Sequence, residues 1–166
     1  MELLHLAGAA GFVVGLDFAA GMIEVAAARA AGPRYVRGDV LVLPFADAAF
    51  DAVTMAFGLR NLADPLLGLE EMRRVLRRGG RAVVLEFVRP RPGVVGSAYR
   101  AYLKHALPRI GGWISGQPRA YRYLSDTIDA YHTPSELVAL AERAGWRGLE
   151  LRLLNLGTVG LLAGEG

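Results

Sequence analysis

The sequence of 166 residues predicts an α/β domain whose mostly parallel sheet has helices on both faces and ends in an antiparallel hairpin. Short apolar segments alternate with helical ones up to residue 88, which is the order of a parallel sheet with right-handed helical crossovers. Polar side chains follow three of the expected strands, at the edge where doubly wound proteins bind ligands. The length and a hydrophobic content of 53% fit one domain over residues 1–166.

Local signals mark the ends of the expected elements. Gly-Pro and Gly-Gly pairs stop helices, and Asp64-Pro65 starts one with a capping side chain followed by proline. Thr133-Pro134-Ser135-Glu136 has the pattern of a capping box. The expected elements in order are strand 12–16, helix 21–31, strand 35–37, strand 51–56, a helix from 64 to the Gly79-Gly80 pair, strand 81–88, a helix over 133–144, and strands near 148–154 and 158–163.

Residues 89–129 interrupt this alternation. Prolines and glycines there separate aromatic residues such as Tyr99, Tyr102 and Trp113. A glycine-hinged aromatic insertion after a sheet strand favours a lid over a ligand. A helical hairpin packed as ordinary core is an equally weighted alternative.

The composition excludes several classes of function. Without cysteine, the chain has no disulfide, thiolate metal site or cysteine nucleophile, and His5, His105 and His132 lack the spacing of metal ligands. The net charge of +3 is spread along the chain, so no nucleic-acid partner is expected. No apolar run reaches the roughly 18 residues of a membrane span, and no basic leader opens a signal peptide. We therefore expect a cytoplasmic protein, or one lying peripherally on the inner face of the membrane.

Three strand ends carry candidate ligand-binding residues. Asp17 can accept hydrogen bonds from both hydroxyls of a ribose, although a helix cap explains it equally well. Asp39 can accept from an adenine amino group while the Val40 N–H donates to the ring, and a turn-stabilising role is the even alternative. Met22 could flank the adenine, but a place in the core is the stronger interpretation. Arg60-Asn61 follows the third strand, which ends at Ala56, where the sequence gives the pair little structural purpose.

A series of motifs runs in order through nearly the whole chain. These are Val14-Gly15-Leu16-Asp17-Phe18, Gly21-Met22, Gly38-Asp39, Leu43-Pro44-Phe45, Phe57-Gly58-Leu59-Arg60-Asn61, Arg74-Val75-Leu76, Gly79-Gly80-Arg81, Leu85-Glu86-Phe87, Tyr121-Arg122-Tyr123-Leu124 and Asn155-Leu156. The set resembles the UbiE-type C-methyltransferases of quinone biosynthesis, which methylate demethylmenaquinol or the ubiquinone precursor. The segments 57–61 and 121–124 are specific to that family, and the other motifs are shared with methyltransferases generally.

The resemblance implies a Rossmann-like class I methyltransferase that uses S-adenosylmethionine and converts demethylmenaquinol to menaquinol. By this resemblance, the cofactor is contacted at Asp17, Asp39, Val40 and Ala56. Alternatives are methylation of the ubiquinone precursor, or an inactive chain of the same fold that binds a quinone or a partner.

The resemblance also implies that Arg60-Asn61 faces a polyprenyl hydroquinol, with Phe57, Tyr121 and Tyr123 at its ring. Arg60 stays charged at any working pH, so it could stabilise the phenolate oxygen or hold a water that takes its proton. Asn61 would orient Arg60 or the substrate oxygen. Residues 99–114 could cover the ring and touch a membrane surface, and the chain could form a homo-oligomer.

The family's first strand and its Asp-x-x-x-Gly-x-Gly loop are expected before Val13, where only twelve residues stand. This strand would lie mid-sheet, between the strands that end at Asp17 and Ala56, and its absence would expose two unpaired edges. We expect a start codon assigned too late or a deliberately shortened chain. Asn155-Leu156-Gly157 also departs from the family's usual Asn-Leu-Thr.

This expectation yields a binding prediction. Because the glycine loop holds the methionine end of the cofactor in the family, the 166 residues should bind S-adenosylmethionine poorly, and a version extended upstream should bind it well. Calorimetric titration of both chains measures the difference. Equally tight binding by the shorter chain would contradict the prediction.

Overall fold

The computed structural model describes residues 11–29, 32–89, 93, 96, 99, 101, 127–128 and 131–166. The predicted lid over residues 89–129 falls almost wholly outside this part of the chain, and so do Tyr121 and Tyr123. The chain divides into two compact units, Met1–Ala46 and Asp47–Gly166. The single domain expected over residues 1–166 stays a prediction.

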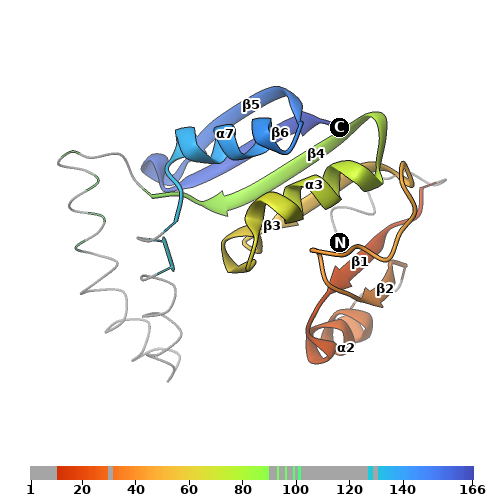
Figure 1. Cartoon of the computed structure of the whole chain (residues 1–166). Coiled ribbons are helices and arrows are strands. Elements are labelled where there is room, and N and C mark those ends of the chain that lie inside the picture. The colour runs from red at the N-terminus through yellow and green to blue at the C-terminus, as the bar shows by residue number, and fades with distance from the viewer. Residues whose placement is uncertain are drawn as a thin grey trace, which may run out of the picture. The chain divides into compact units, whose positions relative to one another are not determined.

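The first unit is a parallel strand–helix–strand motif (Figure 1). It consists of β1 (Val14–Asp17), α2 (Ala20–Arg29) and β2 (Arg34–Arg37). The two strands pair with Val14 opposite Arg34 and Asp17 opposite Arg37, as the alternation of elements predicts. A Cβ at Gly15 would lie 2.8 Å from the Tyr35 ring, so only glycine lets β2 approach with that aromatic side chain.

The second unit is built on a four-stranded mixed sheet with the order β3-β4-β6-β5. Its strands are β3 (Phe50–Ala56), β4 (Leu76–Phe87), β5 (Arg147–Leu154) and β6 (Val159–Glu165), joined to the short 3-10 turns η1 (Leu59–Asn61) and η3 (Asn155–Gly157). β3 and β4 are parallel, whereas β6 runs antiparallel to both β4 and β5. The expected C-terminal antiparallel hairpin is therefore confirmed.

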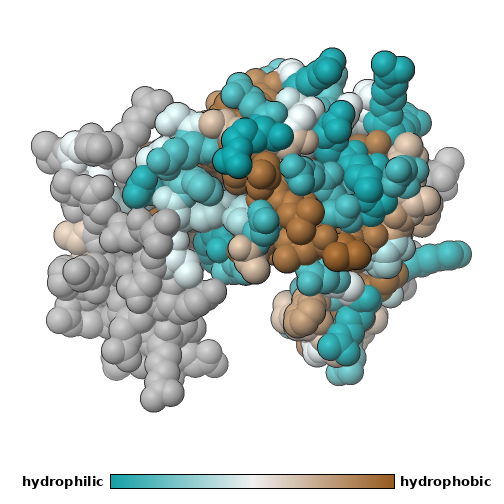
Figure 2. Space-filling model, viewed as in Figure 1, coloured by the Kyte–Doolittle hydropathy of each residue, from teal (hydrophilic) through white to brown (hydrophobic). Residues whose placement is uncertain are grey.

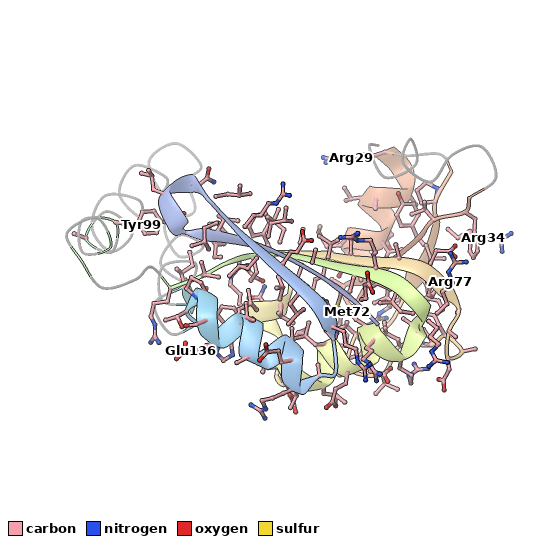
Figure 3. The ribbon with its side chains drawn as sticks, turned by 90° about the horizontal axis from the view of Figure 1, so that it is seen from above. Arg29, Arg34, Met72, Arg77, Tyr99 and Glu136 are labelled. Carbon is pink, nitrogen blue, oxygen red and sulfur yellow. The ribbon has the colours of Figure 1, made fainter. Side chains whose placement is uncertain are left out.

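Two capped helices, α3 (Pro65–Val75) and α7 (Pro134–Arg143), lie on the same face of this sheet (Figures 1 and 3). Both predicted caps are present. The Asp64 side chain accepts a hydrogen bond from the Leu67 N–H, and Thr133 and Glu136 form the reciprocal capping box. The helices thus begin at the residues that the sequence indicates.

The core lies between the two helices and the sheet. Trp146 follows α7, and its indole N–H donates to the Leu69 carbonyl of α3 across 3.0 Å in the buried interior. Met72, on the inner side of α3, is 1% exposed (Figure 3). The core members are Leu59, Leu69, Met72, Leu76, Ala82, Val84, Val88, Tyr131, Leu137, Leu140, Ala141, Ala144, Trp146 and Leu162.

α3 is shorter than the sequence predicts. It ends at Val75 instead of continuing to the Gly79-Gly80 pair, and Leu76 is already extended and buried in β4. The pairing with β3 then shifts between Phe50 and Ala52, so the glycines serve a bulge in the strand. A Cβ at Gly80 would lie 2.8 Å from the Arg77 carbonyl oxygen, which explains glycine there better than a helix stop does.

Apolar side chains remain exposed on the described surface. Figure 2 shows an apolar area in the region of α3, where Leu67 is 37% exposed. On α2 no residue is buried, and Met22 is 58% exposed, so a place for Met22 in the core is not observed. The apolar side chains Met22 and Val25 of that helix are therefore exposed in the described part of the chain.

The capping box predicts a pH dependence of stability. The hydrogen bond from the Thr133 backbone N–H lowers the pKa of the Glu136 carboxyl below its ordinary value of 4.5. A lowered pKa in the folded state means that the ionised carboxylate adds stability above that value, and that this stability is lost as the pH falls through the folded-state pKa. Glu136→Gln should therefore lower the melting temperature at pH 7, and the difference from wild type should disappear in acid.

Thermal unfolding followed by circular dichroism between pH 3 and pH 7 measures this difference, in roughly the range where carboxylates titrate. Glu142→Gln is the matched control, because Glu142 is an exposed residue near the C-terminal end of the same helix, away from the capping box. A deficit of Glu136→Gln that stays constant across the range would contradict the assignment.

Candidate functional site

The loop that follows β3 has a strained first residue. Phe57 adopts a φ of +55°, a left-handed conformation that is unusual outside glycine and costs about 1–3 kcal/mol. Its N–H donates to the Leu85 carbonyl of β4 at 2.8 Å, so the turn begins at the carboxyl end of the parallel pair. Gly58 follows, and then the 3-10 turn η1 carries Arg60 and Asn61.

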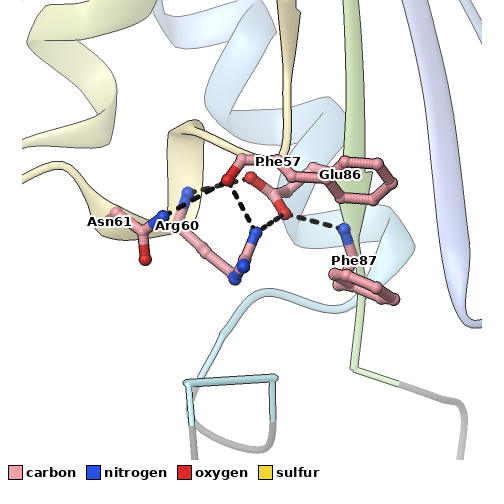
Figure 4. Close-up of polar contacts among 5 residues, drawn as sticks. All are labelled: Phe57, Arg60, Asn61, Glu86 and Phe87. Atoms are coloured by element: carbon pink, nitrogen blue, oxygen red, sulfur yellow. Dashed lines mark hydrogen bonds and ion pairs between the residues drawn. The ribbon is translucent and has the colours of Figure 1, made fainter. Parts of the chain in front are cut away.

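The Phe57 carbonyl is the shared acceptor for two polar side chains of this loop (Figure 4). It accepts hydrogen bonds from Arg60 Nη1 at 2.8 Å and from Asn61 Nδ2 at 3.2 Å. Arg60 and Asn61 therefore hold the turn that carries them. The Arg-Asn pair has a structural purpose that the sequence did not reveal.

Glu86 of β4 is the second anchor of the loop. Its Oε1 lies 2.7 Å from Arg60 Nη1 and also accepts from the Phe87 N–H at 2.8 Å, while its Oε2 accepts from the Arg60 backbone N–H at 3.1 Å. Glu86 is fully buried, and the Arg60 side chain is 10% exposed. Breaking such a pair from one side leaves an uncompensated buried charge, which costs about 3–5 kcal/mol.

Two aromatic rings lie next to the ion pair. The rings of Phe57 and Phe87 have centroids 4.8 Å apart, and the Arg60 guanidinium carbon lies 5.3 Å from the centre of the Phe87 ring. Phe57 is 37% exposed, so one aromatic face of this cluster reaches the surface. A flat apolar ligand and a charged donor group can therefore meet at this loop.

Two buried polar atoms near the pair have no partner among the described residues. These are Arg60 Nε and the Tyr131 hydroxyl oxygen. Burial, and then the negative charge of Glu86, raises the pKa of the Tyr131 hydroxyl far above its usual range, and the charge of Arg60 offsets part of this. Tyr131 thus stays protonated and able to donate. A buried polar atom without a partner costs about 1–3 kcal/mol.

The first unit holds the other predicted binding residues. Asp17 and Asp39 follow successive parallel strands, and each uses Oδ1 to accept one local N–H, from Ala19 at 2.8 Å and from Leu41 at 2.9 Å. Asp39 therefore has the suggested turn-stabilising role, whereas Asp17 bonds the residue before α2 and not an N–H of the first helical turn. The second oxygen of each carboxylate, and the Val40 N–H, have no partner among the described residues.

The structure brings the predicted residues together in two groups. Ala56, Phe57, Arg60 and Asn61 share the end of β3 and the loop after it. The second group is Asp17, Met22, Asp39 and Val40 of the first unit. Tyr121 and Tyr123 lie outside the described residues, so their place at the substrate ring stays a prediction.

Sequence reasoning gave no role to Glu86 or Tyr131. A carboxylate inside the apolar run Val83-Val84-Leu85-Glu86-Phe87-Val88 was an available signal, because a charge in a buried strand needs a partner. Tyr131 carries no comparable signal, since a tyrosine beside a capping box fits many surroundings. The ring of its neighbour His132 lies edge-on to the Tyr131 ring, with the two ring centroids 4.8 Å apart.

Two further features of the described residues bear on function. No helix among them is both long and apolar enough to span a membrane. Nor do three histidine, aspartate or glutamate side chains gather there in a group that could hold a metal ion.

Solved structures place the fold among the methyltransferases. A SAM-dependent methyltransferase from Thermotoga maritima matches 92% of this chain and 72% of its own, with a TM-score of 0.67 and 19% identity. One from Aquifex aeolicus covers 99% of this chain and 76% of its own, with a TM-score of 0.60 and 18% identity. The predicted Rossmann-like class I methyltransferase fold is confirmed.

Sequence comparison identifies the family. The model of the ubiE/COQ5 methyltransferase family matches residues 1–165. The chain is 46% identical over 163 residues to the demethylmenaquinone methyltransferase of Mycolicibacterium vanbaalenii, and 45% identical over 157 residues to that of Thermus thermophilus. The two alignments cover 98% and 92% of this chain, and each covers 71% of the relative. The chain belongs to the ubiE/COQ5 methyltransferase family.

Proposed function

We propose that this chain carries the activity of a demethylmenaquinone methyltransferase, transferring a methyl group from S-adenosylmethionine to demethylmenaquinol. The observation that carries the proposal is its identity of 43 to 46% with proteins of that name over at least 92% of its length. The acceptor is then a polyprenyl hydroquinol. Its long apolar tail supports a peripheral contact with the membrane surface.

The reaction replaces a ring C–H by a C–CH3 bond. The methyl–sulfur bond breaks with its electron pair staying on sulfur, and one proton is released. The acceptor carbon becomes nucleophilic as the neighbouring hydroxyl loses its proton. The protein must therefore stabilise negative charge on that oxygen and hold the carbon in line with the methyl group.

Arg60 has the chemistry that this oxygen requires. Its charge is permanent, and its Nε–H is buried and has no hydrogen-bond partner among the described residues. The exposed ring of Phe57 beside it offers a flat surface for the aromatic acceptor. In this proposal Arg60 stabilises the phenolate, and Asn61 supports the loop through the Phe57 carbonyl.

The first unit fits one half of the cofactor. When bound, S-adenosylmethionine supplies an electrophilic methyl group on a sulfonium. Asp17 retains an oxygen for the ribose hydroxyls, and Asp39 and the Val40 N–H retain an acceptor and a donor for the adenine edge. Met22, which is exposed on α2, can cover the adenine ring. Ala56 is proposed to contact the cofactor at the end of β3.

Substitution of Arg60 separates a catalytic role from a structural one. Arg60→Ala should lower kcat about 10²- to 10³-fold because it removes a donor aimed at developing charge. Arg60→Lys keeps a charge for Glu86 but lacks the planar fork of donors, so it should restore little of the lost rate. The affinity for S-adenosylmethionine should stay nearly unchanged in both.

Initial rates with demethylmenaquinol in detergent, in the protein expressed from its complete reading frame, provide the measurement. Arg152→Ala, an exposed arginine on β5, is the matched control. An Arg60→Ala protein that loses thermal stability but still transfers methyl groups would require withdrawal of the catalytic assignment.

A second variant tests the cofactor assignment. Asp17→Asn should weaken S-adenosylmethionine binding by about tenfold or more, because a charged acceptor for two hydroxyls becomes a neutral amide. Isothermal titration on the same complete protein measures this, with Glu24→Gln on exposed α2 as the control. If Asp17→Asn and wild type bind S-adenosylmethionine equally well, the cofactor role of Asp17 is contradicted. Its local hydrogen bond to Ala19 would then be its only role.

A further inference from the structure

Glu86 makes more contacts with the loop than charge balance alone requires. Ala82, Val84 and Glu86 alternate along β4 as buried positions, and Val88 continues the alternation just after the strand, so the carboxylate points to the apolar side covered by the helices. Leaving a carboxylate there is unfavourable unless each oxygen is satisfied. Here Oε1 and Oε2 both accept hydrogen bonds, and both contact Arg60, one through its side chain and one through its backbone.

Only one nitrogen of the Arg60 side chain takes part in the ion pair. The Arg60 side chain contacts Glu86 and the Phe57 carbonyl through Nη1 alone, whereas arginine–carboxylate pairs frequently use two parallel N–H groups. The Nε–H is left without a partner among the described residues, although it is buried. A pair kept only for stability would gain more from using both donors.

Tyr131 is a second buried polar group near the ion pair. Tyr131 is 8% exposed, and its hydroxyl has no partner among the described residues. The charges of Glu86 and Arg60 both act on the pKa of this hydroxyl. The His132 carbonyl accepts from the Arg89 N–H at 2.9 Å, which fixes this segment beside the end of β4. Two buried polar atoms, Arg60 Nε and the Tyr131 hydroxyl oxygen, therefore have no partner in the described part of the chain.

We propose that Glu86 is a positioning residue: it holds Arg60 by Nη1 and by the backbone so that the Nε–H faces the hydroxyl oxygen of the aromatic acceptor. This inference rests on the proposed function. Glu86 touches neither substrate nor cofactor in this account and acts only through Arg60. Its loss should therefore affect turnover through the orientation of the guanidinium, with little effect on cofactor binding.

The test uses the protein expressed from its complete reading frame, with 1,4-dihydroxynaphthalene, the acceptor ring without its tail, kept reduced. Glu86→Gln should lower kcat about a hundredfold, the usual cost of a group displaced by about 1 Å. The KM for S-adenosylmethionine should not change. Glu150→Gln, at an exposed residue of β5, is the matched control and should behave as wild type.

A double-mutant cycle gives the decisive readout. In an Arg60→Lys background, Glu86→Gln should lower kcat no further, because lysine has no Nε–H for the carboxylate to direct. Losses that multiply in the double variant, or a folded Glu86→Gln protein with the wild-type kcat, would overturn the inference.

A third variant covers the case in which Glu86→Gln does not fold. Glu86→Asp keeps the negative charge but withdraws it by one methylene, so kcat should fall while cofactor KM stays constant. An unchanged kcat would overturn the inference. Wild-type protein that methylates neither this probe nor demethylmenaquinol would overturn the proposed function, and the inference with it. If the wild type is active, the Glu86 variants test the inference alone.

Discussion

The buried ion pair between Arg60 and Glu86 organises the described end of the sheet. Glu86 projects from the C-terminal end of β4 into the apolar side of the unit, where its charge requires a partner. That partner is Arg60, in the loop after β3. The buried charge on β4 therefore fixes the conformation of the loop that follows the neighbouring strand. The strained Phe57 is part of this arrangement, since its carbonyl shares the Arg60 Nη1 donor with Glu86.

Much of the fold could be predicted because its signals are local. The caps at Asp64 and Thr133, the prolines after them and the C-terminal hairpin depend on residues adjacent in sequence, and all are observed. The predicted end of α3 was wrong, because it depends on tertiary pairing. Gly79-Gly80 has the pattern of a helix stop, but the pairing of Leu76 with Phe50 brings the chain into the sheet several residues earlier.

The candidate site was predictable only in part. Arg60-Asn61 and the acidic strand ends stand out as polar residues at the carboxyl edge of a parallel sheet. The partner of Arg60 lies 26 positions away and could be found only by asking what neutralises a charge within an apolar strand. Nothing in the sequence links Tyr131 to that pair, because their proximity arises from the packing of the segment before α7 beside β4.

The arrangement of the ion pair predicts that Glu86 presents the Arg60 Nε–H to the acceptor oxygen. A crystal structure of the complete protein with S-adenosylhomocysteine and 1,4-dihydroxynaphthalene tests it most directly. We expect an acceptor oxygen within about 3.2 Å of Arg60 Nε, the limit of an N–H···O hydrogen bond, with the contact between Nη1 and Glu86 retained. An acceptor bound away from Arg60, or a guanidinium that leaves Glu86 to reach it, would contradict the account.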